Sequence, residues 1–93
     1  MATDEQLETI RARIDAIDGQ LLELISDRAR CAQEVAEIKL AAVQSDTKAS
    51  PMFYRPEREA QVLRAIQDRN PGPLPGDYMA RIFREIMSSC LAL

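Results

Sequence analysis

The sequence predicts an all-α fold of three helices that assembles as an intertwined homodimer. Three observations support the all-α fold, and the length of the first helix supports the dimer. Apolar residues recur at alternating intervals of three and four along residues 4–42, no segment alternates as a strand does, and two connections containing proline divide the remainder into two shorter amphipathic segments. Because 93 residues is the length of one domain, we expect a single domain over residues 1–93.

The first helix is expected over about residues 4–42, with Thr3 or Asp4 able to cap its start. Position 28 of its apolar seam carries Arg28 where the pattern calls for an apolar residue. Gly19 lies off the seam and costs about 1 kcal/mol of helix propensity without ending the helix. The seam follows a heptad pattern made of Leu7, Ile10, Ile14, Ile17, Leu21, Leu24, Cys31, Val35 and Ile38.

Two further helices and two loops complete the expected domain. Residues 43–55 lose the apolar period and gather Ser, Asp, Thr and Pro, so we expect a loop there. Pro56 suits the first turn of a helix over residues 56–69. The segment NPGPLPG predicts a loop over residues 70–76, before a third helix over residues 77–93.

The length of the first helix predicts assembly. A helix of this span is about 57 Å long. A compact domain of this size has a radius of gyration of about 12 Å. The helix must therefore extend beyond anything that its own chain can fold around it. We expect a second copy to lie along it and cover the remaining seam.

Composition excludes several classes of function. The net charge of −3 argues against nucleic-acid binding, and no stretch is apolar and long enough to span a membrane. The N-terminus lacks the features of a signal peptide, so we expect a cytoplasmic protein whose Cys31 and Cys90 are reduced thiols. The absence of histidine excludes mechanisms that use Ser-His-Asp or Cys-His groups and the usual zinc chemistry.

Two cations of the first helix suggest an anion site. Arg28 and Lys39 are eleven residues apart, so they lie within about 20° of one face and about 17 Å apart along the axis. Arg28 on its own is also typical of a residue that fixes the register of a helical seam. Arg11 points elsewhere, and its spacing alone favours a solvated surface residue. In an antiparallel dimer, however, Arg11 could complete the site of the partner subunit.

The motif RPERE adds a cation and a carboxylate at the start of the second helix. Arg58 lies near the positive end of the helix, where an anion would stabilise it. Glu59 shares a face with Val62, Leu63 and Ile66, so it points partly inward. A carboxylate in a basic pocket can accept a hydroxyl proton. Together these residues suggest a cavity for a small dianion that carries a hydroxyl group.

Four segments, IRARIDAID, DRARCAQEVAEIK, FYRPEREAQVL and YMARIFREIMSSCLAL, resemble the all-helical class of chorismate mutases. The resemblance is closest to the N-terminal mutase domain of bifunctional chorismate mutase–prephenate dehydratases. It implies an intertwined homodimer that converts chorismate to prephenate by a Claisen rearrangement, a step toward phenylalanine and tyrosine. It also implies that no cofactor or metal is needed, and that a prephenate dehydratase domain follows this one in a longer protein.

The same resemblance implies a role for each of the charged residues. Arg28, together with Arg11 of the partner subunit, would hold the substrate carboxylates. Lys39 would reach a carboxylate and the ether oxygen, where negative charge develops as the C–O bond breaks. Arg58 would add positive potential, and Glu59 would accept the ring hydroxyl.

Three other positions complete the comparison with the family. The backbone of Arg55 would assist at the ring hydroxyl. Cys90 stands where the family usually has a serine that touches a substrate carboxylate. The family has Gln or Glu one turn later, at position 94, beyond Leu93, so we expect slow turnover from the 93-residue chain.

Two other functions stay open from the residues. An isochorismate-pyruvate lyase shares the fold and most of the basic pocket. A non-catalytic helical dimerisation or regulatory module would need neither the pocket nor a ligand.

Overall fold

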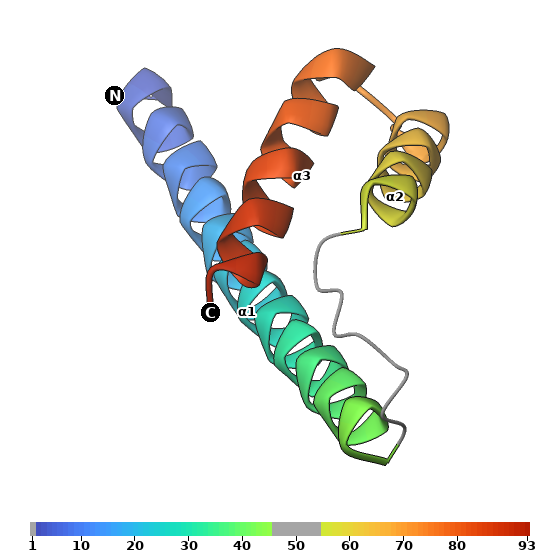
Figure 1. Ribbon diagram of the computed structural model, residues 1–93. Helices are drawn as coiled ribbons and strands as arrows, with labels where there is room; N and C mark the ends of the chain where they lie inside the picture. Colours follow the sequence, from blue (N-terminus) through green and yellow to red (C-terminus); the bar gives the residue numbers. More distant parts are fainter. Residues whose placement is uncertain (1, 46–54) are drawn as a thin grey trace.

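The computed structural model describes residues 2–45 and 55–93, which form three helices and, within those ranges, no strand. They are α1 (Ala2–Ser45), α2 (Pro56–Arg69) and α3 (Gly76–Leu91), shown in Figure 1. The predicted all-α architecture with a long first helix is confirmed. No described helix combines the length and the apolar character needed to cross a membrane.

The helix bounds differ from the expected ones at the ends of α1 and α3. Helix α1 continues to Ser45, so the expected loop over residues 43–55 begins too early, and its residues 46–54 lie outside the described part of the chain. Alanines at 41 and 42 favour helix, and no glycine or proline follows at once to end it. Helix α3 begins one residue earlier than expected and ends at Leu91, where Ala92 caps it.

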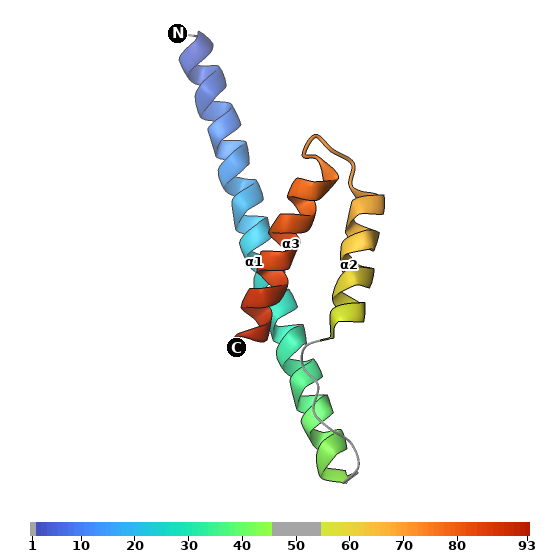
Figure 2. The same ribbon diagram turned by 45° about the horizontal axis from the view of Figure 1, so that its top comes forward.

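Helix α3 joins the other two helices. It packs against both α1 and α2 (Figure 2). Helix α2 lies alongside α3, and the C-terminal end of α3 reaches the middle of α1. The N-terminal half of α1 extends past this cluster.

The turn between α2 and α3 is built around Asn70. Its side-chain Nδ2 donates to the carbonyl oxygen of Leu74 at 2.7 Å, while the backbone N–H of Gly72 donates to Asn70 Oδ1 at 3.2 Å. Gly72 has a φ of 75°, a left-handed conformation that glycine adopts at low cost. These bonds let α3 return alongside α2, which brings its far end to α1.

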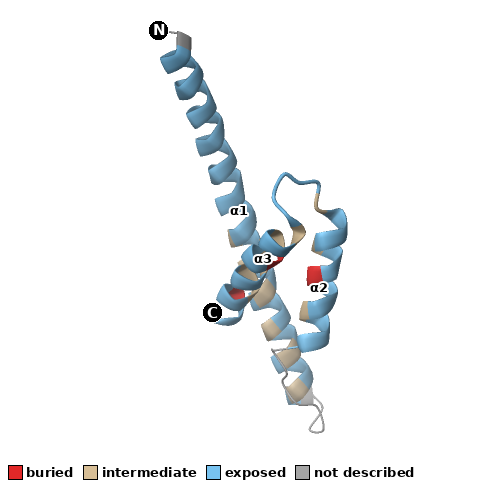
Figure 3. Cartoon of the chain, turned by 90° about the horizontal axis from the view of Figure 1, so that it is seen from above, coloured by how far each residue is buried: buried red, intermediate tan, exposed pale blue. Residues whose placement is uncertain are grey.

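The single chain buries very little. Among the described residues, the buried apolar side chains are Leu63, Ala80 and Cys90. The seam of α1 stays about half exposed, as at Ile14 (50%) and Ile17 (51%), and Figure 3 shows the N-terminal half of the helix exposed. The radius of gyration is 18.4 Å, well above the ~12 Å of a compact chain of this length. The predicted overhang of α1 is therefore present.

Candidate functional site

A groove runs between the C-terminal half of α1, the start of α2 and the end of α3. Its volume is about 1360 Å³, more than the ~300–1,000 Å³ of typical small-ligand pockets. A single chain therefore leaves this site open on part of its perimeter. The charged residues that line it are Arg28, Glu37, Lys39, Arg55, Glu57, Arg58, Glu59 and Arg64.

The groove brings together most of the residues that the sequence singled out. Arg11 does not line it, and lies exposed in the N-terminal half of α1. The predicted residues that do line it are Arg28, Lys39, Arg55, Arg58, Glu59 and Cys90.

One wall of the groove comes from α1. Arg28 and Lys39 are both half-buried there, which matches their shared face. Cys31, Ala32 and Val35 lie between them in the sequence and also line the groove. The α1 wall thus carries a cation towards each end, and between them it carries these small or apolar side chains together with the polar Gln33 and Glu37.

The first turn of α2 forms the opposite wall. Arg55 precedes the helix in an extended conformation (φ −127°, ψ 98°), and its carbonyl accepts the N–H of Glu59 at 3.0 Å. Pro56 takes the first helical position, where no N–H is needed. Glu59 is half-buried, whereas Arg58 is exposed. The start of α2 therefore presents a carboxylate and a cation side by side.

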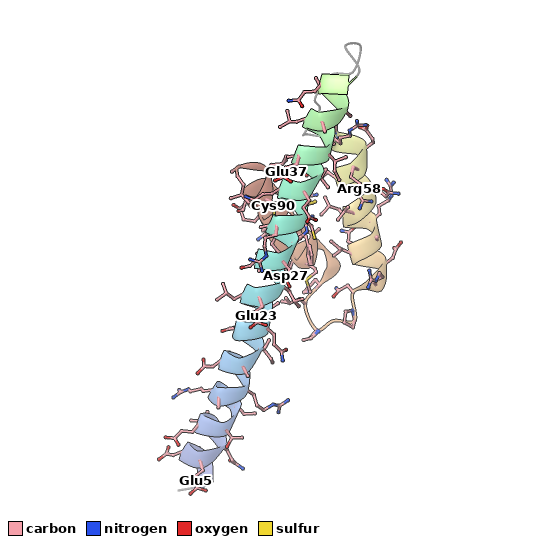
Figure 4. All side chains as sticks on the ribbon, turned by 90° about the horizontal axis from the view of Figure 1, so that it is seen from below. Glu5, Glu23, Asp27, Glu37, Arg58 and Cys90 are labelled. Carbon is pink, nitrogen blue, oxygen red and sulfur yellow. The ribbon has the colours of Figure 1, made fainter. Side chains whose placement is uncertain are left out.

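Helix α3 closes the end of the groove. Cys90 is buried with a free thiol, and Met87 lies one turn before it. Figure 4 shows Cys90 of α3 beside α1, and shows Arg58 of α2 level with Glu37 of α1. The end of the groove formed by α3 is therefore largely apolar, whereas the charges of the groove come from α1 and the start of α2.

The groove is more positive than the chain as a whole. Five cations and three carboxylates line it, giving a net charge of +2, while the whole chain carries −3. Within the described residues, no cluster of side chains could hold a metal ion. A positive groove with an apolar end suits a small organic anion.

Four polar residues of the groove were not anticipated from the sequence: Gln33, Glu37, Gln61 and Arg64. Gln61 is bonded to Arg58, whose Nη1 donates to its Oε1 at 2.8 Å. The sequence did contain one signal for this pair. Arg58 and Gln61 are three residues apart, and residues at that spacing are neighbours on the surface of a helix.

Comparison with known proteins identifies relatives along the whole chain. It is 57% identical over 93 residues to the bifunctional chorismate mutase/prephenate dehydratase of Pseudomonas aeruginosa, covering 100% of this chain and 25% of that protein. The Neisseria gonorrhoeae protein of the same name is 47% identical over 90 residues, covering 97% and 22%. The chain thus spans about a quarter of the length of these relatives.

A solved structure has the same fold. The chorismate mutase (form II) of Thermus thermophilus superposes with a TM-score of 0.82 at 28% identity, covering 95% of this chain and 92% of that one. The family model described as chorismate mutase type II matches residues 10–93, which include every residue lining the groove. The chain belongs to the chorismate mutase type II family.

Proposed function

We propose that this chain converts chorismate to prephenate in the groove between α1, α2 and α3. The observation that carries the proposal is the net charge of +2 in this groove, gathered from α1 and α2 in a chain whose total charge is −3. Chorismate carries two carboxylates and one hydroxyl. The groove offers cations for the first and the carboxylate of Glu59 for the second.

Each wall has a separate part in binding. Arg28 suits a substrate carboxylate, because a guanidinium can donate two parallel hydrogen bonds to it. Glu59 is half-buried at the start of α2 and accepts the ring hydroxyl, with the backbone of Arg55 beside it. Arg58 adds positive potential on the same wall. Cys90 lines the apolar end, where the family resemblance implies a contact with a substrate carboxylate.

The rearrangement itself is unimolecular, so the protein has two tasks. The cations and Glu59 hold the flexible side chain of chorismate over its ring, in the shape that reacts. Lys39 donates to the ether oxygen, which gains negative charge as the C–O bond breaks. Because this charge is larger in the transition state than in the substrate, Lys39 increases the rate of the step.

The proposed site includes a second copy of the chain. The apolar seam of α1 is about half exposed from Leu7 to Leu21, and an antiparallel copy of α1 would cover it. In that arrangement the N-terminal half of one α1 lies near the C-terminal half of the other. Arg11 of the partner subunit would then close the open side of the groove and bind the substrate with Arg28.

The product connects this chain to a second reaction. The relatives from Pseudomonas and Neisseria are named as both chorismate mutases and prephenate dehydratases. We include in the proposal that prephenate formed here is the substrate of such a dehydratase, as part of phenylalanine biosynthesis.

The test follows the loss of the diene absorbance of chorismate, with prephenate identified by NMR. Lys39→Met should lower kcat by at least about 100-fold, the usual effect of removing a group that stabilises developing charge. Arg84→Met is the control, because Arg84 is exposed on α3 and does not line the groove. A folded parent chain that leaves chorismate unchanged would refute the proposal. Consumption of isochorismate with release of pyruvate would favour the lyase instead.

A further inference from the structure

Arg58 and Gln61 form a side-chain hydrogen bond within the groove. Arg58 Nη1 donates to Gln61 Oε1 at 2.8 Å, and both residues line the groove. The two residues are three positions apart on α2, so they are neighbours on the helix surface. The bond joins a cation of the proposed site to a residue without an assigned role.

Within the described part of the chain, the bond to Gln61 is the side-chain hydrogen bond that holds Arg58, and Arg58 forms no ion pair there. It is exposed at the N-terminal end of α2, where the helix dipole disfavours a cation. Its sequence neighbours Glu57 and Glu59 lie on other sides of the helix, since adjacent residues do not face each other. An exposed arginine samples many rotamers and loses that freedom when it binds a ligand. The bond to Gln61 reduces this loss in advance.

A neutral acceptor has a further advantage in this position. Outside the groove, Arg30 pairs with Asp27 at 2.5 Å, and there the carboxylate cancels the charge of the cation. The amide of Gln61 orients Arg58 and leaves its charge intact. A guanidinium has five N–H donors, so the remaining ones are available to an anion.

We propose that Gln61 is a positioning residue that holds the Arg58 guanidinium ready for the anionic substrate without neutralising it. This inference rests on the proposed rearrangement of chorismate. Gln61 acts only through Arg58, so its removal affects substrate binding more than the chemical step.

Two variants separate orientation from charge. Gln61→Met keeps the length of the side chain and removes the acceptor, so KM for chorismate should rise about five-fold, while kcat changes less than two-fold. Gln61→Glu keeps an acceptor and adds a negative charge, so KM should rise at least as much. Added salt should reduce the effect of Gln61→Glu, because it screens the new charge, and leave that of Gln61→Met in place.

A purely structural role gives a different pattern. Gln61→Glu would then behave as the parent, because its bond to Arg58 is retained, and only the melting temperature of Gln61→Met would change. Asp27→Asn is the matched control, since it weakens an exposed pair of the same spacing outside the groove and should leave KM unchanged. KM values of both Gln61 variants within two-fold of the parent would overturn the inference.

The pairing itself can be observed without turnover. NMR of the Arg58 guanidinium nitrogens should show slow rotation in the parent chain and faster rotation in Gln61→Met. Unchanged Arg58 signals in an active enzyme would overturn this inference alone. A parent chain that does not consume chorismate would overturn the proposed function and this role with it, whatever the NMR signals show.

Discussion

Arg28 and Lys39 line the same groove from one helix, although eleven residues separate them. Eleven residues are close to three full turns, so both side chains leave α1 on one side, about 17 Å apart. Arg28 also occupies a seam position that would otherwise be apolar. At this position, therefore, the seam of α1 becomes the wall of the groove.

Replacing Arg28 with leucine restores the apolar pattern, and the effects on activity and stability should be opposite. Arg28→Leu should lower kcat/KM for chorismate at least about 100-fold, because a two-point contact with a carboxylate is lost. The melting temperature should stay equal or rise, since an unfavourable cation leaves the seam. Arg30→Leu, exposed and outside the groove, is the control. Full activity in Arg28→Leu would show that the site lies elsewhere.

Mixing two inactive variants tests whether Arg11 serves the partner subunit. In a mixed dimer of Arg11→Ala and Lys39→Ala, one site has both native residues and the other has neither. Random exchange of subunits makes half of the dimers mixed, so about a quarter of the parent activity should return. If Arg11 acted in its own chain, mixing would restore nothing. Each variant mixed with itself controls for changes caused by the exchange procedure.

A charge on the α1 seam should separate the subunits. Ile14 is 50% exposed in the single chain, and burying a glutamate in its place would leave an unpaired charge in the proposed dimer interface. Ile14→Glu should sediment as a monomer at micromolar concentration and lose activity. Ala12→Glu introduces the same charge on the opposite face of the helix and should stay dimeric. Equal sedimentation of both variants would argue against this interface.

Replacing Gly19 or Gly72 with alanine should change the stability of the protein in opposite directions. Gly19 lies inside α1, and apart from its chain neighbours and the nearby backbone of its own helix no atom lies within 4 Å of the place that an added methyl group would take. Gly19→Ala should therefore stabilise the protein by about 1 kcal/mol. Gly72 also has free space, but its φ of 75° strains any other residue, so Gly72→Ala should destabilise by about 1 kcal/mol. Thermal unfolding of both variants beside the parent measures the difference. A stabilised Gly72→Ala would contradict the turn geometry.

Cys90→Ser should increase the amount by which a bound substrate or product stabilises the protein. Cys90 is 8% exposed, and a hydroxyl buried there without a partner costs about 1–3 kcal/mol. A bound carboxylate would supply that partner. The increase in melting temperature caused by chorismate or prephenate should therefore be larger for Cys90→Ser than for the parent. Cys90→Ala controls for packing, and an equal increase in all three proteins would exclude contact between this position and the ligand.

The sequence predicted those features that depend on local chemistry. Pro56 marks the first position of α2, and the segment from Asn70 to Gly76 ends that helix, so α2 covers the expected residues 56–69. The period of α1 placed Arg28 and Lys39 on one face. The end of α1 was predicted less well, because no glycine or proline marks it and helix propensity alone continues past Ala42.

Features that depend on packing between helices could not be predicted in the same way. That the start of α2 faces the C-terminal half of α1 follows from how α3 returns along α2 and meets α1. The pairing of Arg58 with Gln61 has the same spacing as that of Asp27 with Arg30. The sequence alone gives no reason to place one of these pairs in the groove and the other outside it.

The small core of the single chain, taken with the proposed dimer, predicts a fold that is sensitive to dilution. Among the described residues, three apolar side chains are buried, while large apolar residues along α1 stay about half exposed. In the proposed dimer most of the stabilising free energy would come from association, and mass action would apply. Each tenfold dilution should remove about 1.4 kcal/mol from the stability of the dimer. The melting temperature should therefore depend on protein concentration, and the subunits of the proposed dimer should separate and unfold in one event.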